Sequence, residues 1–299
     1  VLAYPRDTVA RRALRAEVAP GDVVLIHRAR PTRREARFWR ALLWLTGGTT
    51  LLFLIAPILA IMPLSFNGGS FLVYPLDGVS LRWFEEFFES ERWMGALANS
   101  LIVGGATTVL ATALGIPAAL GLNHAPLRFR GLLTGLLLSP MIVPVVIVAV
   151  GLYFAFAAVG LTNSYAGLIL AHTALAAPFV VITVGATLQG LDRNLPRAAS
   201  SLGARPTTVF FQVTLPLILP GVVSGALFAF VTSFDEVVVA LLLAGPGQRT
   251  LPREMFNGIR ESITPTIAAA ASVLIVVSTL MLIAIEALRR RGERLRARR

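Results

Sequence analysis

The chain has 299 residues, of which 56% are hydrophobic and only 14% are charged, and its mean hydropathy is +0.74. A soluble domain of this length cannot bury so much apolar surface, so the composition excludes an ordinary soluble protein and indicates an integral membrane protein. The net charge of +11 comes from arginine alone, and the absence of cysteine excludes disulfides, thiolate metal sites and a cysteine nucleophile.

Six stretches are apolar and long enough to cross a bilayer, for which a helix needs about 20 residues. They lie near 41–64, 97–122, 131–158, 165–188, 215–243 and 265–288. Pro140 and Pro144 are expected to kink the third stretch. Gly104, Gly105 and Gly115 are expected to let a neighbouring helix approach the second.

The arginines are distributed unequally between the two sides of such a bundle. Ten lie before the first stretch, two at 123–130, three at 189–214 and seven after Leu288, a total of 22, against five in the remaining loops. The positive-inside rule therefore predicts that both termini are cytoplasmic. We expect a basic cytoplasmic arm (1–40), a six-helix domain (41–290) and a basic cytoplasmic tail (291–299), and we attribute the charge to membrane topology rather than to nucleic-acid binding.

Two segments are expected on the outer side. Residues 80–97 mix aromatic and acidic side chains, which predicts a short amphipathic helix at the outer interface with Trp83 and Trp93 as membrane-belt residues. Residues 245–265 are long for a connection between two spans, and loops of this length are usually functional or disordered.

The segment LDRNLPRAASSLGARPTTVFFQVTLPLILPG, residues 191–221, is also longer than a connection requires. One face of a helix is predicted by the spacing of Leu191, Leu195, Ala198, Ala199 and Leu202. Gly203 follows as a helix stop, and a second helical run carries Phe210, Phe211 and Val213. The apolar face has three possible environments, namely lipid, its own bundle or the groove of a partner.

Several motifs carry a family resemblance. The run AASSLGA followed by LPLILPG resembles the EAA loop of ABC transporter permease subunits, and SPMIVPVVIVAVGLYF resembles their third span. The run SFDEVVVALLLAGPGQRTLPREMFNGIRESITP resembles spermidine/putrescine-type permeases. The resemblance covers about residues 41–290. It implies an all-α integral membrane fold, the transmembrane domain of a type I ABC importer, with six spans and a cytoplasmic coupling helix.

In that family the loop docks into a cleft of the ATPase, so the resemblance assigns the coupling role to the loop 191–214. The residues concerned are Arg197, Ala198, Ala199, Leu202, Gly203, Ala204 and Phe210. The family usually has glutamate before the two alanines, where this chain has Arg197. An ion pair made by that glutamate is therefore not assumed here.

Two carboxylates interrupt the fifth apolar stretch in the run TSFDEVVVALLLAG. Charges in a membrane span are costly and indicate function by default. The candidate substrate pathway comprises Asp235, Glu236, Phe234, Thr232 and Ser233. Adjacent helical residues point about 100° apart, so only one carboxylate is expected to face the pathway. The other is expected to take a partner within the bundle, or a donor such as Thr232 or Ser233. The alternative is a purely structural role within the bundle.

Three further residues are weaker pathway candidates. His172 is a single histidine in the fourth stretch, and such residues are more often hydrogen-bonded packing residues. Tyr153 and Phe230 could hold an alkylammonium group by cation–π contact, although aromatic side chains in a membrane protein more often pack.

The sequence contains no Walker-type phosphate loop and no metal-ligand cluster. ATP and Mg²⁺ are therefore assigned to a separate ATPase dimer, and this chain is predicted to be no enzyme. The resemblance further implies a second permease subunit, favouring a heterodimer, a periplasmic or extracellular substrate-binding protein, and the bacterial inner membrane. The predicted substrate is a polyamine or similar small cation. The alternatives are another small solute (phosphonate, thiamine or iron), a secondary transporter or a membrane enzyme.

Overall fold

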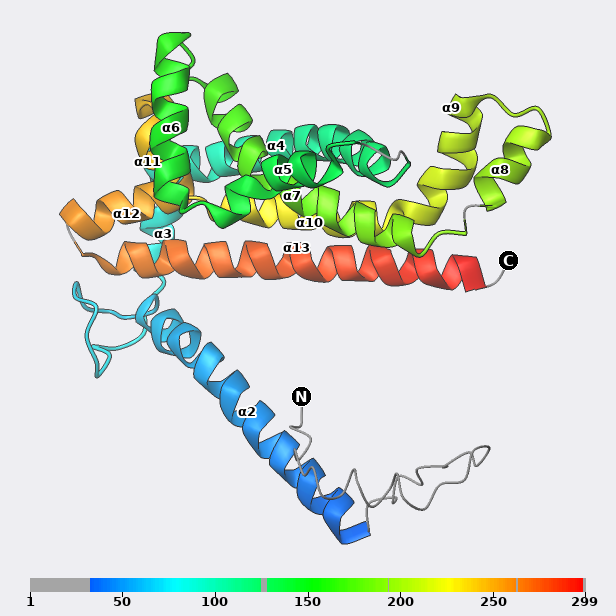
Figure 1. Cartoon of the computed structure of the whole chain (residues 1–299). Coiled ribbons are helices and arrows are strands. Elements are labelled where there is room, and N and C mark those ends of the chain that lie inside the picture. The colour runs from blue at the N-terminus through cyan, green and yellow to red at the C-terminus, as the bar shows by residue number, and fades with distance from the viewer. Residues whose placement is uncertain (1–32, 125–127, 193, 262, 298–299) are drawn as a thin grey trace, which may run out of the picture. The chain divides into compact units, whose positions relative to one another are not determined.

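The computed structural model describes residues 33–124, 128–192, 194–261 and 263–297 (Figure 1). The chain divides into two compact units, 1–57 and 58–299, with the boundary inside helix α2 (Arg33–Leu64). Most of the expected arm 1–40 lies outside the described residues. The expected tail continues helix α13 (Pro265–Ala297) as far as Ala297.

The all-α prediction is confirmed, and the described residues contain five helices that are long and apolar enough to cross a membrane. These are α2, α4 (Glu91–His124), α7 (Tyr165–Gln189), α10 (Leu215–Phe234) with the turns that precede it, and α13. The pair α5 (Arg130–Ile142) and α6 (Val145–Ala158) gives a sixth span if the two helices count as one.

Proline breaks the third predicted span more sharply than a kink. The axes of α5 and α6 differ by 106°. Pro140 remains inside α5, whereas Pro144 is the residue that precedes α6 and has no N–H with which to continue the helix. The chain therefore turns back at Val143 and Pro144.

The core of the second unit is formed by α4, α7 and α10, which pack side by side (Figure 1). Small residues set the spacing of these helices: a Cβ added at Gly115 would meet the side chain of Val180, and one at Gly104 would lie 3.0 Å from the Phe230 ring. These two predicted approach points are confirmed. The prediction for Gly105 is wrong, because nothing lies within 4 Å of its added Cβ.

The helix predicted within residues 80–97 is present as α3 (Arg82–Glu89), but its tryptophans are not membrane-belt residues. Trp83 is only 4% exposed, and its indole N–H donates to the Asn67 carbonyl at 2.7 Å. Trp93, at the start of α4, packs in a cluster with Phe87 and Leu251. The belt prediction fails because both indoles have protein partners rather than lipid: Trp83 has the Asn67 carbonyl, and Trp93 has residues of α12 (Leu251–Glu261) and α13.

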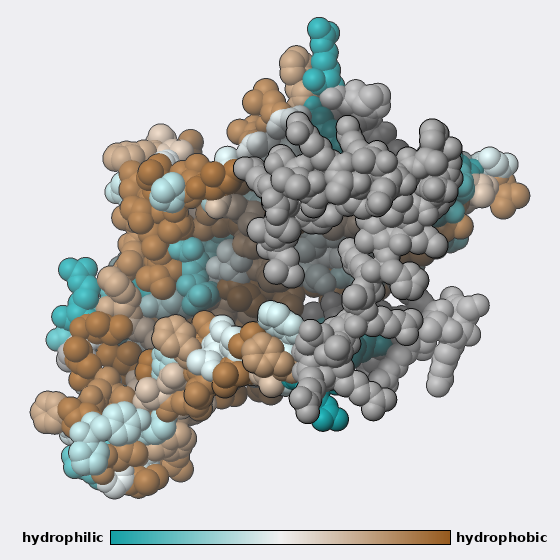
Figure 2. Space-filling view, turned by 60° about the horizontal axis from the view of Figure 1, so that its bottom comes forward, coloured by the Kyte–Doolittle hydropathy of each residue, from teal (hydrophilic) through white to brown (hydrophobic). Residues whose placement is uncertain are grey.

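The surface of the chain is apolar over much of the face shown in Figure 2, as a protein surrounded by lipid requires. The exposed large side chains include Leu132, Ile147 and Phe154 on α5 and α6. These residues are available for contact with lipid or with a second membrane subunit.

Candidate functional site

Two ends of the second unit carry the candidate residues. The first end holds α3, α11 (Val238–Leu243) and α12, together with the start of α4 and of α7. The opposite end holds α8 (Asn194–Ser201), α9 (Pro206–Val209) and a π-helical turn, η1 (Phe210–Thr214), which leads into α10 (Figure 1). Helix α10 therefore connects the predicted coupling loop directly to the acidic pair.

The acidic pair does not lie inside a continuous helix, which corrects the predicted span 215–243. Helix α10 ends at Phe234, and α11 begins at Val238. The backbone N–H of Asp235 still donates to Val231, but the carboxylate of Glu236 accepts from the backbone N–H of Val239 at 3.0 Å. A side chain that satisfies the backbone in this way competes with helix continuation, so α10 stops and a new helix starts.

The two carboxylates consequently have different environments. Glu236 is half-buried and is engaged by the first turn of α11, where a negative charge is favoured by the N-terminal end of a helix. Asp235 is exposed at the break, and no hydrogen bond to its carboxylate occurs among the described residues. Glu236 is thus the acid that has a structural partner. That partner is the backbone N–H of Val239 rather than the side chain of Thr232 or Ser233.

The other predicted pathway residues lie mostly inside the bundle. The hydroxyl of Ser233 is buried and is 2.8 Å from Nδ1 of His172, which is itself buried in α7. Phe234 is 2% exposed and stacks on Phe230 with ring centroids 5.2 Å apart. Thr232 is half-buried. Of the predicted set, Asp235 presents its side chain most openly.

The predicted coupling loop is a short helix, a turn and a second helix. Helix α8 ends at Ser201, and Gly203 follows with a φ of +87°, in the left-handed region where glycine carries no steric penalty. Arg205 precedes α9, and Phe210 opens the π-helical turn. The helix stop predicted at Gly203 is therefore present.

Helix α8 has two distinct faces. Leu195, Ala198 and Leu202 are exposed, and Leu202 is 88% exposed. Pro196, Arg197, Ser200 and Ser201 lie on the opposite side and line a cavity of about 870 Å³ between α8 and the ends of α4 and α7. Ala199 and Ala204 are half-buried.

These placements divide the predicted coupling set. Only part of its apolar face, Leu195, Ala198 and Leu202, remains free for a partner. Leu191, predicted on the same face, lines the cavity instead, as do Arg197 and Phe210.

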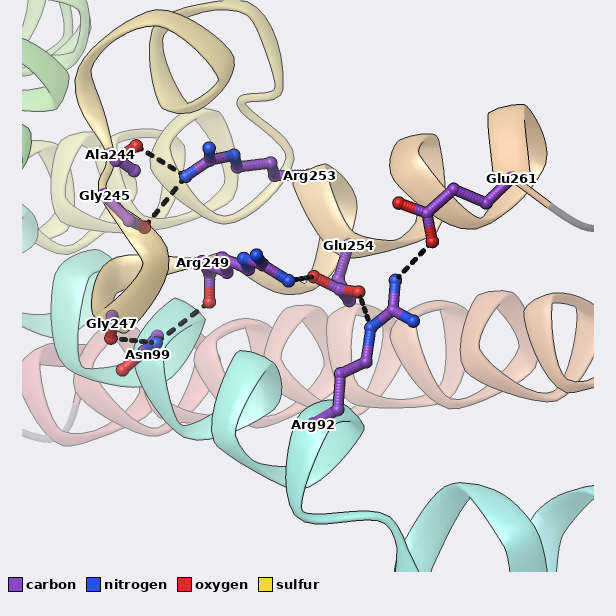
Figure 3. A network of polar contacts seen from close by, with 9 residues as sticks. All are labelled: Arg92, Asn99, Ala244, Gly245, Gly247, Arg249, Arg253, Glu254 and Glu261. Carbon is purple, nitrogen blue, oxygen red and sulfur yellow. Dashed lines mark hydrogen bonds and ion pairs between the residues drawn. The ribbon is translucent and has the colours of Figure 1, made fainter.

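Sequence analysis missed a polar network at the α12 end (Figure 3). The side chain of Glu254 is completely buried between Arg92 and Arg249, to which its two carboxylate oxygens are paired. Arg92 also reaches Glu261 at 3.3 Å. The missed signal was the acidic residue on the apolar face of an amphipathic segment, because a carboxylate there must be paired when it is buried.

The same network fixes the connection between α11 and α12. Arg253 donates to the Ala244 and Gly245 carbonyls at 2.7 and 3.1 Å (Figure 3). Burial and the neighbouring Arg249 lower the pKa of Arg253, whereas the nearby Glu254 raises it. Asn99 on α4 donates to the carbonyls of Gly247 and Arg249. Residues 245–261 of the segment expected to be either functional or disordered are therefore ordered and tied to the helix bundle.

The comparisons with known proteins agree with this architecture. Residues 111–294 match the family described as "Binding-protein-dependent transport system inner membrane component". The chain belongs to this family. It is a multi-pass inner-membrane permease subunit of an ABC importer, and membership implies assembly with an ABC ATPase and a substrate-binding protein.

Among the described residues no group of three or more His, Asp and Glu side chains could hold a metal ion.

Several characterised relatives are similar over most of their length. The chain is 35% identical over 245 residues to the putrescine transport system permease protein PotI of Escherichia coli (strain K12), covering 79% of this chain and 85% of the relative. It is 32% identical to the spermidine/putrescine transport system permease protein PotC of Haemophilus influenzae, covering 77% and 90%. It is also 35% identical to the molybdenum transport system permease protein ModB of Mycobacterium bovis, covering 70% and 86%.

Solved structures support the same fold. A bacterial ABC transporter that imports the acidic polysaccharide alginate superimposes with a TM-score of 0.67 at 19% identity, covering 86% of this chain and 96% of that one. The MetNI methionine ABC transporter gives a TM-score of 0.57 at 19% identity, covering 68% and 99%. The type I importer fold predicted from the sequence is thus confirmed.

Proposed function

We propose that this subunit imports a polyamine or a similar small cation, and that Asp235 lowers the energy of the cation as it passes. The observation that carries the proposal is the exposed carboxylate at the α10–α11 break, in a chain 35% identical to a putrescine permease. A charged group at a helix end near a membrane is costly unless a cation or donor offsets it. A passing ammonium group supplies that compensation.

An anionic substrate is the second candidate, because the molybdenum permease ModB is also 35% identical, over 70% of this chain, and the α12 end is rich in arginine. The arginines of Figure 3 are, however, engaged in internal contacts. Arg92 and Arg249 pair with Glu254, and Arg253 donates to backbone carbonyls. Their charges hold α12 in place, which favours the cation.

We further propose that the exposed apolar face of α8 docks on the ATPase. Leu195, Ala198 and Leu202 form a stripe without a partner among the described residues, and a stripe of this kind fits an apolar groove. The arginine distribution supports a cytoplasmic position for this end and for both termini, and an outer position for the α12 end. Two such subunits are needed to enclose a pathway, and the similarity to polyamine permeases favours a heterodimer.

Uptake of radiolabelled putrescine by cells that express the complete transporter tests the substrate assignment. Asp235→Asn keeps the size of the side chain but removes its charge, and it is expected to reduce uptake at least about tenfold while the subunit assembles normally. Glu236→Gln is the matched control, since an amide oxygen can still accept from Val239. It is expected to retain most uptake.

Unchanged putrescine uptake by the Asp235→Asn variant, with normal assembly, would reject the role of this carboxylate. Competition of uptake by molybdate but not by spermidine would instead support the anionic alternative. Lower subunit yield in both variants would indicate a structural role for the acidic pair.

A further inference from the structure

The cavity behind α8 has the size and the lining of a ligand site. Its volume of about 870 Å³ falls in the range of small-molecule sites, roughly 300–1,000 Å³. Leu120 and Leu188 contribute apolar surface from α4 and α7, whereas Asn123, Arg197 and Ser201 contribute polar groups. Apolar walls joined to a few convergent polar groups are typical of sites for amphiphilic ligands.

Among the described residues that line the cavity, Arg197 carries the one charge, and it is positive. Arg197 forms no ion pair with any carboxylate in the part of the chain that the structure describes. Arg197 is exposed to solvent and lines the cavity on the side of α8 opposite to Leu202. A planar guanidinium with several free donors is suited to bidentate contact with a phosphate group.

The cavity also lies at the ends of two helices that are long and apolar enough to span a membrane. Asn123 is one residue before the end of α4 and Leu188 one residue before the end of α7, and both helices are long enough to span the hydrocarbon core. The ends of spanning helices reach the headgroup region. Basic pockets between the ends of such helices can bind the headgroups of anionic lipids.

We propose that this cavity binds the headgroup of an anionic phospholipid. Arg197 contacts the phosphate, the hydroxyl of Ser201 donates to one of its oxygens, and the glycerol and first acyl carbons lie against Leu120 and Leu188. Arg197 then acts on the bundle side of α8, behind the face proposed for the ATPase. The bound lipid would support α8 from behind. This inference does not depend on the transported substrate.

Lipid binding to the purified, delipidated transporter complex, measured by native mass spectrometry, tests the proposal. Phosphatidylglycerol and phosphatidylcholine with identical acyl chains are the two probes. The unmodified complex is expected to bind phosphatidylglycerol about tenfold more tightly. Arg197→Gln is expected to abolish this preference. The matched control Arg205→Gln, which removes an exposed arginine of the same loop that does not line the cavity, is expected to keep it.

A second variant addresses the cavity itself without changing its charge. Ser201→Phe fills the space next to Arg197 and is expected to weaken phosphatidylglycerol binding, whether or not Arg197→Gln assembles. Equal binding of the two lipids, or an undiminished preference in both variants, would overturn the proposal. Displacement of the lipid by millimolar inorganic phosphate would instead indicate a site for a free anion. Loss of the ATPase from the Arg197→Gln complex, with the lipid preference unchanged, would assign the cavity to the ATPase.

Discussion

Helices α7 and α10 approach each other closely at Gly221, and replacing this glycine with alanine should separate them. An added Cβ would overlap the Thr187 hydroxyl oxygen and would lie 2.8 Å from the Thr183 carbonyl oxygen. The Thr187 hydroxyl donates to that same carbonyl at 2.9 Å, so it has little freedom to move away. Because the Thr183 carbonyl is backbone and the Thr187 Cβ is fixed to backbone, α10 itself must shift by roughly half an ångström.

Overpacking of this kind usually costs about 1–3 kcal/mol. For a chain of this size each kcal/mol lowers the melting temperature by about 2–4 °C, so Gly221→Ala should lose several degrees. Fluorescence-detected size-exclusion chromatography of heated, detergent-solubilised protein measures this loss. Gly105→Ala is the matched control, since its added Cβ meets nothing within 4 Å and alanine favours the helix. Equal stability of the two variants would refute the close packing of α7 on α10.

Three further predictions concern the coupling loop, the buried acid and the topology. Gly203→Val places a β-branched residue at positive φ, so it should uncouple ATP hydrolysis from uptake while the subunit still inserts; normal uptake would contradict the assignment of the loop. Glu254→Gln should lower the free energy of unfolding by about 1–3 kcal/mol, which is less than for a fully buried ion pair because both arginines are partly exposed. Glu261→Gln at the surface should lower it by less than about 1 kcal/mol. Equal losses of thermal stability in the two variants would refute the central role of Glu254. Reporter fusions after Arg128 and after Arg260 should read cytoplasm and outside, and the reverse pattern would overturn the proposed orientation.

Much of this fold was predictable because membrane spans are encoded locally. The six apolar stretches correspond to five helices and one broken pair, and Pro144 marks the break between α5 and α6. The turn at Gly203 was likewise predictable, because a left-handed residue after a helix favours glycine. Each of these features depends on a short run of sequence and on its local environment, such as the lipid around a membrane span.

The features that could not be predicted depend on contacts between distant segments. Nothing in the local sequence distinguishes a belt tryptophan from Trp83, whose partner Asn67 lies in an earlier loop. Glu254 is buried because Arg92, 162 residues earlier, lies opposite. The break at Asp235 was not predicted, because the mean hydropathy of the whole apolar stretch remains high despite the two acids. Hydropathy also contains no information about the hydrogen bond between Glu236 and the start of α11.

The docking of α8 on an ATPase is the central claim, and cysteine cross-linking tests it directly. The chain has no native cysteine, so Leu202→Cys introduces a single reactive thiol on the exposed face of α8. In membranes that contain the complete transporter, a short bifunctional reagent should link this thiol to the ATPase subunit. Phe256→Cys, exposed at the α12 end, should give no ATPase adduct. An ATPase adduct from Phe256→Cys, or none from Leu202→Cys while the complex is intact, would contradict the account.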